Sequence, residues 1–266
     1  MHNLVHACAL IISIVRTVPD ASNAAYTSGD LGFHTDLLYF KDPPHVQLLH
    51  CVQSASTGGA SVFADGYKAA LDLFHDDVEA FNTLATIPVN YHYTHPDSNV
   101  YRTTKAVIDL LPLRIGGTTY THISDYIGAW NEMYNPHDQS AASTDKLVVG
   151  LMQKINWGPP FLAPFSNHEP HAPREDPLSV LNDKVERWHG AAQKYNALLQ
   201  RPAYLYERTM KSGECVLFDN TRTLHSRRAF EKADVGKPRW LRGTYVDRDA
   251  YLSSVRVLNR KYGGHS

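Results

Sequence analysis

The 266-residue chain contains few cysteines and no surplus of charge of either sign. Its three cysteines, Cys8, Cys51 and Cys215, include no CxxC pair, which excludes a disulfide framework and a cysteine-rich zinc site and favours a reducing compartment. Lys and Arg total 26 against 27 Asp and Glu, so the formal charge is −1. A protein that binds nucleic acid through phosphate contacts needs a basic surplus, so we expect no nucleic-acid partner.

Long apolar runs are also missing. The apolar stretch at residues 4–15 (LVHACALIISIV) is 12 residues long, whereas a membrane-spanning helix needs about 20. It also lacks the basic segment that begins a signal peptide. We therefore expect no membrane partner, and a buried strand or short helix here, with an uncleaved targeting segment as the alternative. The expected location is the cytoplasm, with the mitochondrion as the alternative.

The signatures of several large enzyme groups do not occur. The sequence contains no GxSxG elbow, P-loop or GxGxxG fingerprint, so a Ser/His/Asp hydrolase and a nucleotide-binding enzyme have no support. No repeat, low-complexity run or Pro/Gly/Ser linker interrupts the chain. We therefore predict a single domain over residues 1–266, with residues 1–15 uncertain and residues 256–266 a polar, basic tail that frays.

Apolar periodicity predicts a strand-rich chain whose helices gather in the middle. Strands are expected at residues 46–52, 61–65, 89–93, 120–126 and 147–157, and further strands within residues 203–257. Helices are expected at residues 67–74, 76–84 and 178–199, the last with Val180, Val185, Trp188, Ala192, Tyr195 and Leu199 largely on one face. This pattern indicates an all-β core that carries a helical insertion.

A histidine and an aspartate stand two residues apart near the start of the chain. Residues 33–36 read Phe-His-Thr-Asp, and alternate residues of a strand point to the same face, so His34 and Asp36 would present an imidazole and a carboxylate side by side. In a helix the same spacing would turn them about 200° apart. The chain has 15 histidines, so such a tripeptide also arises by chance, and alone it predicts little.

A second histidine in a comparable setting changes that interpretation. Residues 215–225 read CVLFDNTRTLH, an apolar strand that leads to His225, 189 residues after Asp36. Two imidazoles and a carboxylate on one face, with three positions left open, form the facial triad of non-haem Fe(II) oxygenases. His168 and His171 lie beside Pro170 without HExxH spacing, and we predict that they are loop residues.

An arginine on a later strand is placed to bind a carboxylate. In RWLRGTYVD (residues 239–247), period-two alternation puts Arg239, Leu241, Gly243 and Tyr245 on one face and Arg242 on the other. A guanidinium binds a carboxylate through two parallel hydrogen bonds, which a lysine does less well. Arg227 and Arg228 are alternatives close to His225, and beside the triad we favour Arg239.

Four blocks of the sequence resemble a known family in the same order. GFHTDLLYFKDPPHVQLLHC, STGGASVFADG, LFDNTRTLHSRRAF and RWLRGTYVDRD are similar to the taurine dioxygenase (TauD) superfamily, and most of all to its γ-butyrobetaine and trimethyllysine dioxygenase branch. The resemblance covers roughly residues 16–258 and is thin between residues 93 and 211. It implies a mainly β fold, a double-stranded β-helix (jelly-roll) core with a helical insertion between the metal-binding strands.

The resemblance also implies a chemistry and a set of site residues. The chain would be an oxidoreductase that uses Fe(II), O₂ and 2-oxoglutarate, with ascorbate as a candidate supporting reductant, to hydroxylate an aliphatic carbon of a small molecule and release succinate and CO₂. His34, Asp36 and His225 match the catalytic iron ligands, and Arg239 matches the arginine that binds the far carboxylate of 2-oxoglutarate. Ser61, after Gly58-Gly59, and Asn23 match residues that contact the co-substrate.

The substrate is less well defined by the resemblance. Tyr26 and Tyr245 match two tyrosines of the cage that holds a trimethylammonium group by cation–π attraction. Leu37 stands where the γ-butyrobetaine enzyme has a tyrosine, and Tyr39 falls on the opposite strand face from His34. The connector at residues 157–165 contains three aromatic residues, Trp157, Phe161 and Phe165. They line the substrate pocket or pack in the core, and the sequence favours neither alternative.

Three readings of the function therefore stay open. The first is hydroxylation of a trimethylammonium carboxylate such as γ-butyrobetaine or trimethyllysine. The second is a tailoring dioxygenase of secondary metabolism with another small substrate. The third is a catalytically impaired jelly-roll binding protein, favoured by the 33 residues that precede His34, fewer than in the family, which indicate a shortened member or a truncated gene product. A homodimer is a candidate assembly in each case.

Overall fold

The computed structural model describes residues 12–16, 27–55, 57–95, 99–165, 178–231 and 239–263. The chain divides into two compact units, which we describe separately. Unit 1 comprises residues 1–37, 41–63 and 206–266, and unit 2 comprises residues 38–40 and 64–205. The expectation of a single domain stays a prediction. No described helix is long and apolar enough to cross a membrane.

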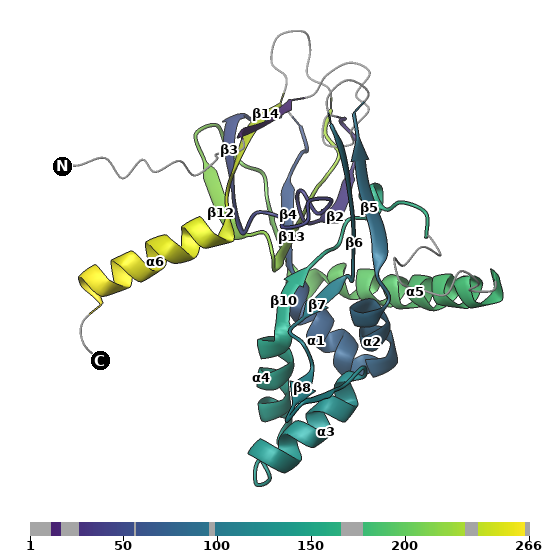
Figure 1. The fold of residues 1–266 in the computed structure, drawn as a ribbon. Coiled ribbons are helices and arrows are strands. Elements are labelled where there is room, and N and C mark those ends of the chain that lie inside the picture. Colours follow the sequence, from purple (N-terminus) through teal and green to yellow (C-terminus); the bar gives the residue numbers. More distant parts are fainter. Residues whose placement is uncertain are drawn as a thin grey trace. The chain divides into compact units, whose positions relative to one another are not determined.

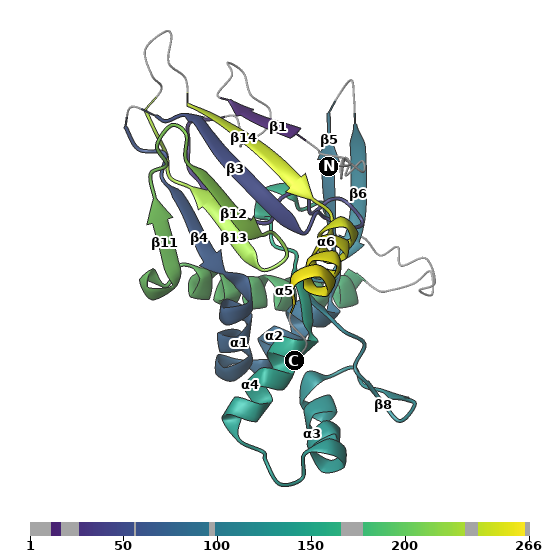
Figure 2. The same ribbon diagram turned by 90° about the vertical axis from the view of Figure 1, so that its left-hand side faces the viewer.

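Unit 1 is built on two four-stranded sheets (Figures 1 and 2). The first sheet has the order β1 (Ile12–Arg16), β14 (Trp240–Val246), β3 (Val46–Gln53), β12 (Cys215–Asp219). The second has the order β11 (Leu205–Arg208), β4 (Ser61–Asp65), β13 (Thr223–Arg227), β2 (Leu31–His34). Both follow chain orders that cross between distant segments, as in a jelly roll.

The core of unit 1 forms where residues of the two sheets meet. Leu49 of β3 and Phe218 of β12 pack with Phe63 of β4, and a second cluster joins Cys51, Met210 and Leu241. Along β14, Leu241, Gly243 and Tyr245 are buried whereas Arg242 is exposed, because alternate residues point to opposite faces. The mainly β core is thereby confirmed, and the alternation predicted for residues 239–245 is observed.

Unit 2 holds the helical insertion, which in sequence lies between β4 and β11. Helices α1 (Gly66–Asp76), α2 (Val78–Thr86) and α5 (Leu178–Leu199) pack together. Asp65 caps α1 by accepting from the backbone of Tyr67 and Lys68, and Asp77 caps α2. Phe81 and Tyr195 are buried among these helices. The three predicted helices are confirmed.

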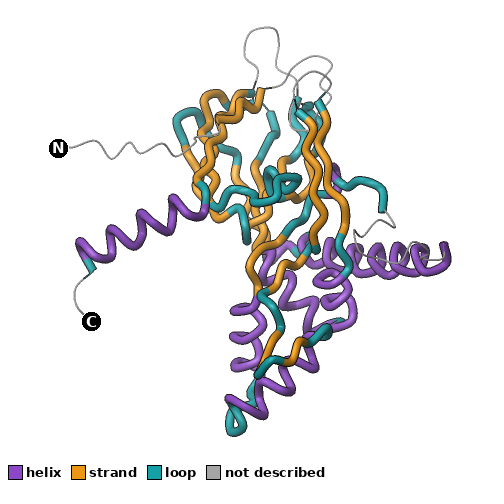
Figure 3. Tube along the Cα trace, in the orientation of Figure 1, coloured by secondary structure: helices purple, strands orange, loops and turns teal. Residues whose placement is uncertain are grey.

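The remaining elements of unit 2 are short. They are helices α3 (Ile123–Tyr134) and α4 (Ala141–Leu151), single 3₁₀ turns at Pro159–Phe161 and Pro202–Tyr204, and the paired strands β5 (Val89–Thr94) with β6 (Val100–Lys105), β7 (Ile108–Leu110) with β10 (Met152–Ile155), and β8 (Arg114–Ile115) with β9 (Thr118–Thr119). The described helices, purple in Figure 3, belong to unit 2 by their residue ranges, except α6 (Arg248–Tyr262), which follows β14 in unit 1.

Two local predictions were wrong, for residues 120–126 and for the tail, and the strand predicted at residues 147–157 was only partly correct. Residues 120–126 are not a strand: their β-branched and aromatic residues favour one, but Ile123, Tyr126 and Ile127 make a buried helical face and His122 caps α3. Residues 147–157 divide between the end of α4 and β10. Residues 256–262 of the expected tail continue α6, whose last turn carries Arg260 and Lys261, a placement that the helix dipole favours.

The predicted apolar segment at residues 4–15 is described only from residue 12, where β1 begins. Strand β1 pairs antiparallel with β14, and Ile12 lies opposite Thr244. This bears out a strand at the end of the segment, and the rest lies outside the described residues.

Candidate metal centre

The predicted triad comes together inside unit 1. Strands β2 and β13 pair so that His34 lies directly opposite His225, and the centroids of the two imidazole rings are 4.3 Å apart. Asp36 follows β2 in a turn, with Oδ1 3.3 Å from His34 Nε2 and 3.8 Å from His225 Nε2. One ligand atom from each of the three residues lies within 4.8 Å of the others. The antiparallel register therefore brings together two histidines that are 191 positions apart in the sequence.

The charge states of these groups suit a divalent metal. Burial lowers the pKa of His225 to about 3, an effect that His34 reinforces and Asp36 only partly opposes. Burial alone would raise the pKa of Asp36, but His225 and His34, helped by a hydrogen bond from Tyr245, hold the pKa of this carboxyl well below its usual value. At neutral pH the site thus offers a neutral imidazole at His225 and one carboxylate, whose Oδ1 faces both imidazoles.

The spacing fits one ion in the middle. Ligand atoms that bind one metal at about 2.1 Å in adjacent positions lie about 3 Å apart. The separations of 3.3 and 3.8 Å from Asp36 Oδ1 are wider than this, and all three ligand atoms lie within 4.8 Å of one another, so the side chains would move inward to bind an ion. His34 Nδ1 lies 2.9 Å from the carbonyl oxygen of Gly32, which leaves Nε2 for the metal. Two nitrogens and one oxygen on one side of an ion are the donor set of a non-haem iron site.

The backbone of Asp36 is held by Asn220, a residue whose role the sequence did not reveal. The amide N–H of Asp36 donates to Asn220 Oδ1 at 2.9 Å, and Asn220 Nδ2 donates to the carbonyl oxygens of Asp36 (3.1 Å) and Pro44 (3.0 Å). The next residue, Leu37, has φ +57°, a left-handed conformation that costs a non-glycine residue about 1–2 kcal/mol. These constraints replace the strand alternation that the sequence had suggested for Asp36.

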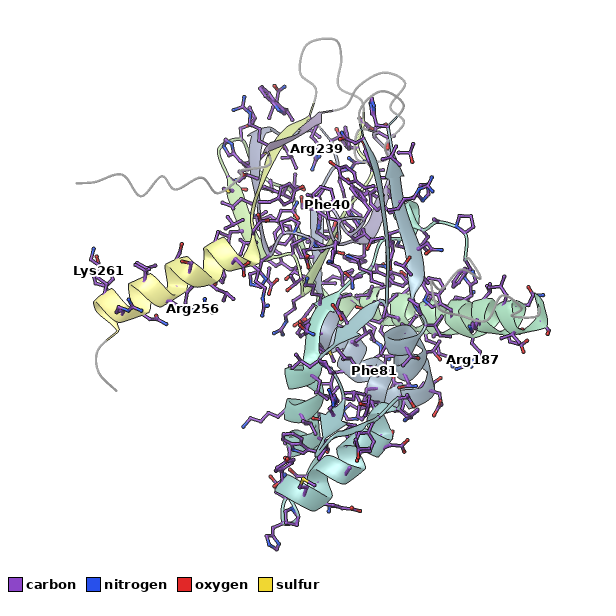
Figure 4. All side chains as sticks on the ribbon, viewed as in Figure 1. Phe40, Phe81, Arg187, Arg239, Arg256 and Lys261 are labelled. Carbon is purple, nitrogen blue, oxygen red and sulfur yellow. The ribbon has the colours of Figure 1, made fainter. Side chains whose placement is uncertain are left out.

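The triad shares its pocket with two of the predicted co-substrate residues. The pocket wall is formed by residues of unit 1: Leu31, His34, Asp36, Leu49, Ser61, His225, Ser226, Arg227, Arg239 and Leu241. Arg239, which directly precedes β14 and is labelled in Figure 4, and Ser61 are both buried. Asn23 and Tyr26 lie outside the described residues.

Of the three arginines considered, Arg239 has the surroundings expected of a carboxylate-binding group. Arg228 is exposed and pairs with Glu207 at 3.0 Å, and Arg227 donates to the carbonyl oxygen of Gly29 at 2.7 Å. Arg239 forms no ion pair with a carboxylate in the described part of the chain. Burial, with some help from Arg227, lowers the pKa of Arg239 to about 10, so the guanidinium stays charged at neutral pH.

The Gly58-Gly59 turn makes room for Arg239. Both glycines are left-handed, with φ +76° and +71°. A Cβ at Gly58 would lie 2.5 Å from the carbonyl oxygen of Ala229, and one at Gly59 would lie 3.3 Å from Arg239 Nε. The N–H of Gly59 donates to the same Ala229 oxygen at 3.0 Å. The turn therefore needs glycine for its backbone angle and for the close approach of the segment after β13.

We expect Gly58→Ala to lower the free energy of unfolding by about 3 kcal/mol, because a strained φ adds to a backbone clash. Gly213→Ala is the matched control, since Gly213 also has a left-handed φ of +92° but open space around it. The control should lose only about 1 kcal/mol. Urea unfolding of both variants measures the difference, and equal losses would contradict the close packing of this turn.

The aromatic residues considered for a substrate cage lie in different surroundings. Tyr245 donates a hydrogen bond from its hydroxyl to Asp36 Oδ2 at 2.7 Å. Tyr39 belongs to unit 2, where it stacks on Tyr93 with ring centroids 4.9 Å apart and planes 18° apart. Rings this close leave no room between them for a trimethylammonium group.

The connector residues pack within unit 2. Trp157 is buried edge-on against Tyr195, and Phe165 lies edge-on to Trp188. The ring centroid of Phe161 lies 5.4 Å from that of Tyr39. These contacts favour the core-packing interpretation of the connector. His168 and His171 lie outside the described residues.

Comparison with known proteins gives one family. The family described as "Taurine catabolism dioxygenase TauD, TfdA family" matches residues 9–245. Dioxygenase str8 of Strobilurus tenacellus is 30% identical over 250 residues, covering 92% of this chain and 47% of that protein. The human gamma-butyrobetaine dioxygenase is 29% identical, covering 91% of this chain and 50% of that protein. The rat mitochondrial trimethyllysine dioxygenase is 26% identical, covering 89% and 44%.

Solved structures support the fold. An asparagine oxygenase matches with a TM-score of 0.55 at 17% identity, covering 88% of this chain and 55% of that one. The non-heme iron oxygenase OrfP, in complex with Fe and alpha-ketoglutaric acid, matches with a TM-score of 0.50 at 13% identity, covering 92% and 58%. The present chain spans about half the length of the curated relatives it matches.

Proposed function

The chain belongs to the TauD/TfdA dioxygenase family, and from this premise we propose that it is an Fe(II)- and 2-oxoglutarate-dependent dioxygenase that hydroxylates an aliphatic carbon of a small molecule. The observation that carries the proposal is the convergence of His34, Asp36 and His225 on one point in a pocket that also contains Arg239. An ancestral fold retained for binding alone would not need to keep both the metal ligands and a buried, charged arginine beside them.

The chain's own groups divide the work of binding. His34 Nε2, His225 Nε2 and an oxygen of Asp36 would hold Fe(II) from one side and leave three positions open. Arg239 would bind the far carboxylate of 2-oxoglutarate, and Ser61 would donate its hydroxyl to the same molecule. The bound iron would supply the oxidation chemistry, in which O₂, 2-oxoglutarate and a substrate C–H bond give an alcohol, succinate and CO₂.

The charges of the pocket favour a dicarboxylate. Asp36 supplies one negative charge to a divalent ion, so the metal end keeps a net positive charge that suits a keto acid. The guanidinium of Arg239 provides a second positive group for the other end of the molecule. Leu31, Leu49 and Leu241 on the wall exclude water and strengthen both attractions.

We would test γ-butyrobetaine and trimethyllysine first as substrates, because the dioxygenases named after these two compounds are 29% and 26% identical to this chain. A tailoring dioxygenase with another small substrate is the alternative, to be tested with carboxylates that lack the trimethylammonium group. The free thiols of Cys51 and Cys215 support a reducing compartment, the cytoplasm or the mitochondrion. A homodimer stays a prediction.

The proposal is tested by titrating the anaerobic protein with Fe(II) and then with 2-oxoglutarate. Chelation of the keto acid to iron produces a visible charge-transfer band, which we expect to saturate at one co-substrate per chain. His225→Ala removes a metal ligand and should abolish the band, while Arg228→Met on the surface should leave it unchanged. A folded wild-type protein that gives no band would refute the proposed activity and favour a binding protein.

A further inference from the structure

The two carboxylate oxygens of Asp36 lie in different surroundings. Oδ1 faces the imidazoles, 3.3 Å from His34 Nε2 and 3.8 Å from His225 Nε2. Oδ2 accepts two hydrogen bonds, from Gln47 Nε2 at 2.5 Å and from the hydroxyl of Tyr245 at 2.7 Å. One oxygen is therefore directed at the candidate metal position, and the other is already occupied by protein donors.

The two donors come from neighbouring strands of the first sheet. Gln47 on β3 and Tyr245 on β14 are direct partners in the antiparallel register, and both side chains point to the inner face. The imidazoles come from the second sheet. The carboxylate of Asp36 thus lies between the two sheets of unit 1: the first sheet contacts Oδ2, and the imidazoles of the second sheet face Oδ1.

Gln47 is a polar side chain that is fully buried, a position where packing alone would favour an apolar residue. It is 0% exposed, and its Oε1 has no hydrogen-bond partner in the described part of the chain. An unpaired amide oxygen destabilises a fold, and an apolar residue of similar size would avoid that cost. The amide N–H groups are the part of this side chain that the site uses.

We propose that Gln47 and Tyr245 are positioning residues that reserve Oδ2 of Asp36, so that the carboxylate offers the metal Oδ1 alone. A carboxylate bound through both oxygens would take two positions of an octahedral ion. With two imidazoles, that would leave only the two positions that 2-oxoglutarate needs and none for O₂. The inference rests on the proposed iron site, and it gives the hydroxyl of Tyr245 a role at Asp36.

The first test measures metal affinity without turnover. Co(II), which does not oxidise in air as Fe(II) does, is titrated calorimetrically into wild type, Gln47→Met, Tyr245→Phe and the double variant. Each single change should weaken Co(II) binding about tenfold, as loss of a group that orients a metal ligand does. Gln53→Met on β3 and Tyr206→Phe on β11 are matched controls remote from Asp36 and should bind as wild type.

The second test asks whether the third open position survives. Nitric oxide binds Fe(II) where O₂ would, and its complex has a characteristic electron paramagnetic resonance signal. In the presence of 2-oxoglutarate, wild type should give the full signal, and Gln47→Met and Tyr245→Phe should give a weaker signal at equal iron loading. A purely structural role for the two residues would leave this signal unchanged.

The outcomes separate the inference from the proposed function. Wild type that binds no Co(II) would refute the iron site, and the inference with it. If wild type binds Co(II) and both variants keep the full nitric oxide signal of wild type, the iron site stands and the inference alone is overturned. If Gln47→Met does not fold, Tyr245→Phe decides the question, because it removes a single oxygen atom.

Discussion

Asp36→Ala is expected to reduce 2-oxoglutarate turnover by on the order of 1000-fold, the largest effect predicted for this chain, because a metal site is worth several kcal/mol to such a reaction. Asp36 is the one carboxylate of the metal-ligating cluster found among the described residues. Its removal leaves two imidazoles, which hold a divalent cation far more weakly than the complete triad. Succinate formation and Fe(II) affinity measure the two consequences.

The control for this experiment is Asp249→Ala, which changes an exposed aspartate in the first turn of α6. It should keep wild-type turnover and metal affinity, so a general effect of losing one negative charge is excluded. If Asp36→Ala kept a tenth or more of the wild-type succinate formation, the assignment of this carboxylate as a metal ligand would be wrong.

Arg239→Met is expected to weaken 2-oxoglutarate binding by on the order of 100-fold or more. A buried, hydrogen-bonded charge pair typically loses about 2–5 kcal/mol when one partner is truncated. Arg239 is buried, and its pKa of about 10 keeps it charged at neutral pH. The KM for 2-oxoglutarate and the titration of the charge-transfer band both report the loss, while Fe(II) affinity should change little.

Two neighbouring arginines make this test specific. Arg228→Met should behave as wild type, because Arg228 is exposed and paired with Glu207. Arg227→Met changes a buried arginine of the same pocket that already donates to Gly29. Arg239→Lys should recover only part of the affinity, since an ammonium cannot form two parallel hydrogen bonds to a carboxylate. A larger loss in Arg227→Met than in Arg239→Met would transfer the role to Arg227.

Residue types and local spacing suggested the metal triad and the arginine of the candidate site, and the family resemblance added the 2-oxoglutarate chemistry. His34 and Asp36 stand two apart, His225 ends an apolar strand, and Arg239 shares a strand face with Leu241. The structure brings these four into one pocket, with Asn23 and Tyr26 outside the described residues. Local spacing misled at residues 120–126, because composition favoured a strand while the spacing of Ile123, Tyr126 and Ile127 served a helix.

The surroundings of Asp36 could not be read from the sequence. Its partners Gln47, Asn220 and Tyr245 are 11, 184 and 209 residues away in the chain. Periodicity specifies which face of its own strand a side chain occupies, but it carries no information on which distant strand lies opposite or in what register. Tyr245 illustrates this limit: the resemblance suggested a place in a cage, which stays a prediction, and the contact of its hydroxyl with Asp36 became visible only with the pairing of β14 and β3.

The amino-acid sequence alone, through the resemblance of its four blocks, gave the family and the jelly-roll core, and through residue type and short-range alternation it gave the residues that we propose bind metal and carboxylate. Only the tertiary structure decided how Asp36 is presented. The turn after β2, the left-handed Leu37 and the donors from Asn220, Gln47 and Tyr245 act together only once both sheets have formed. Hydrogen-bond geometry at a buried carboxylate is a property of the packed sheets, and no single segment of the chain contains it.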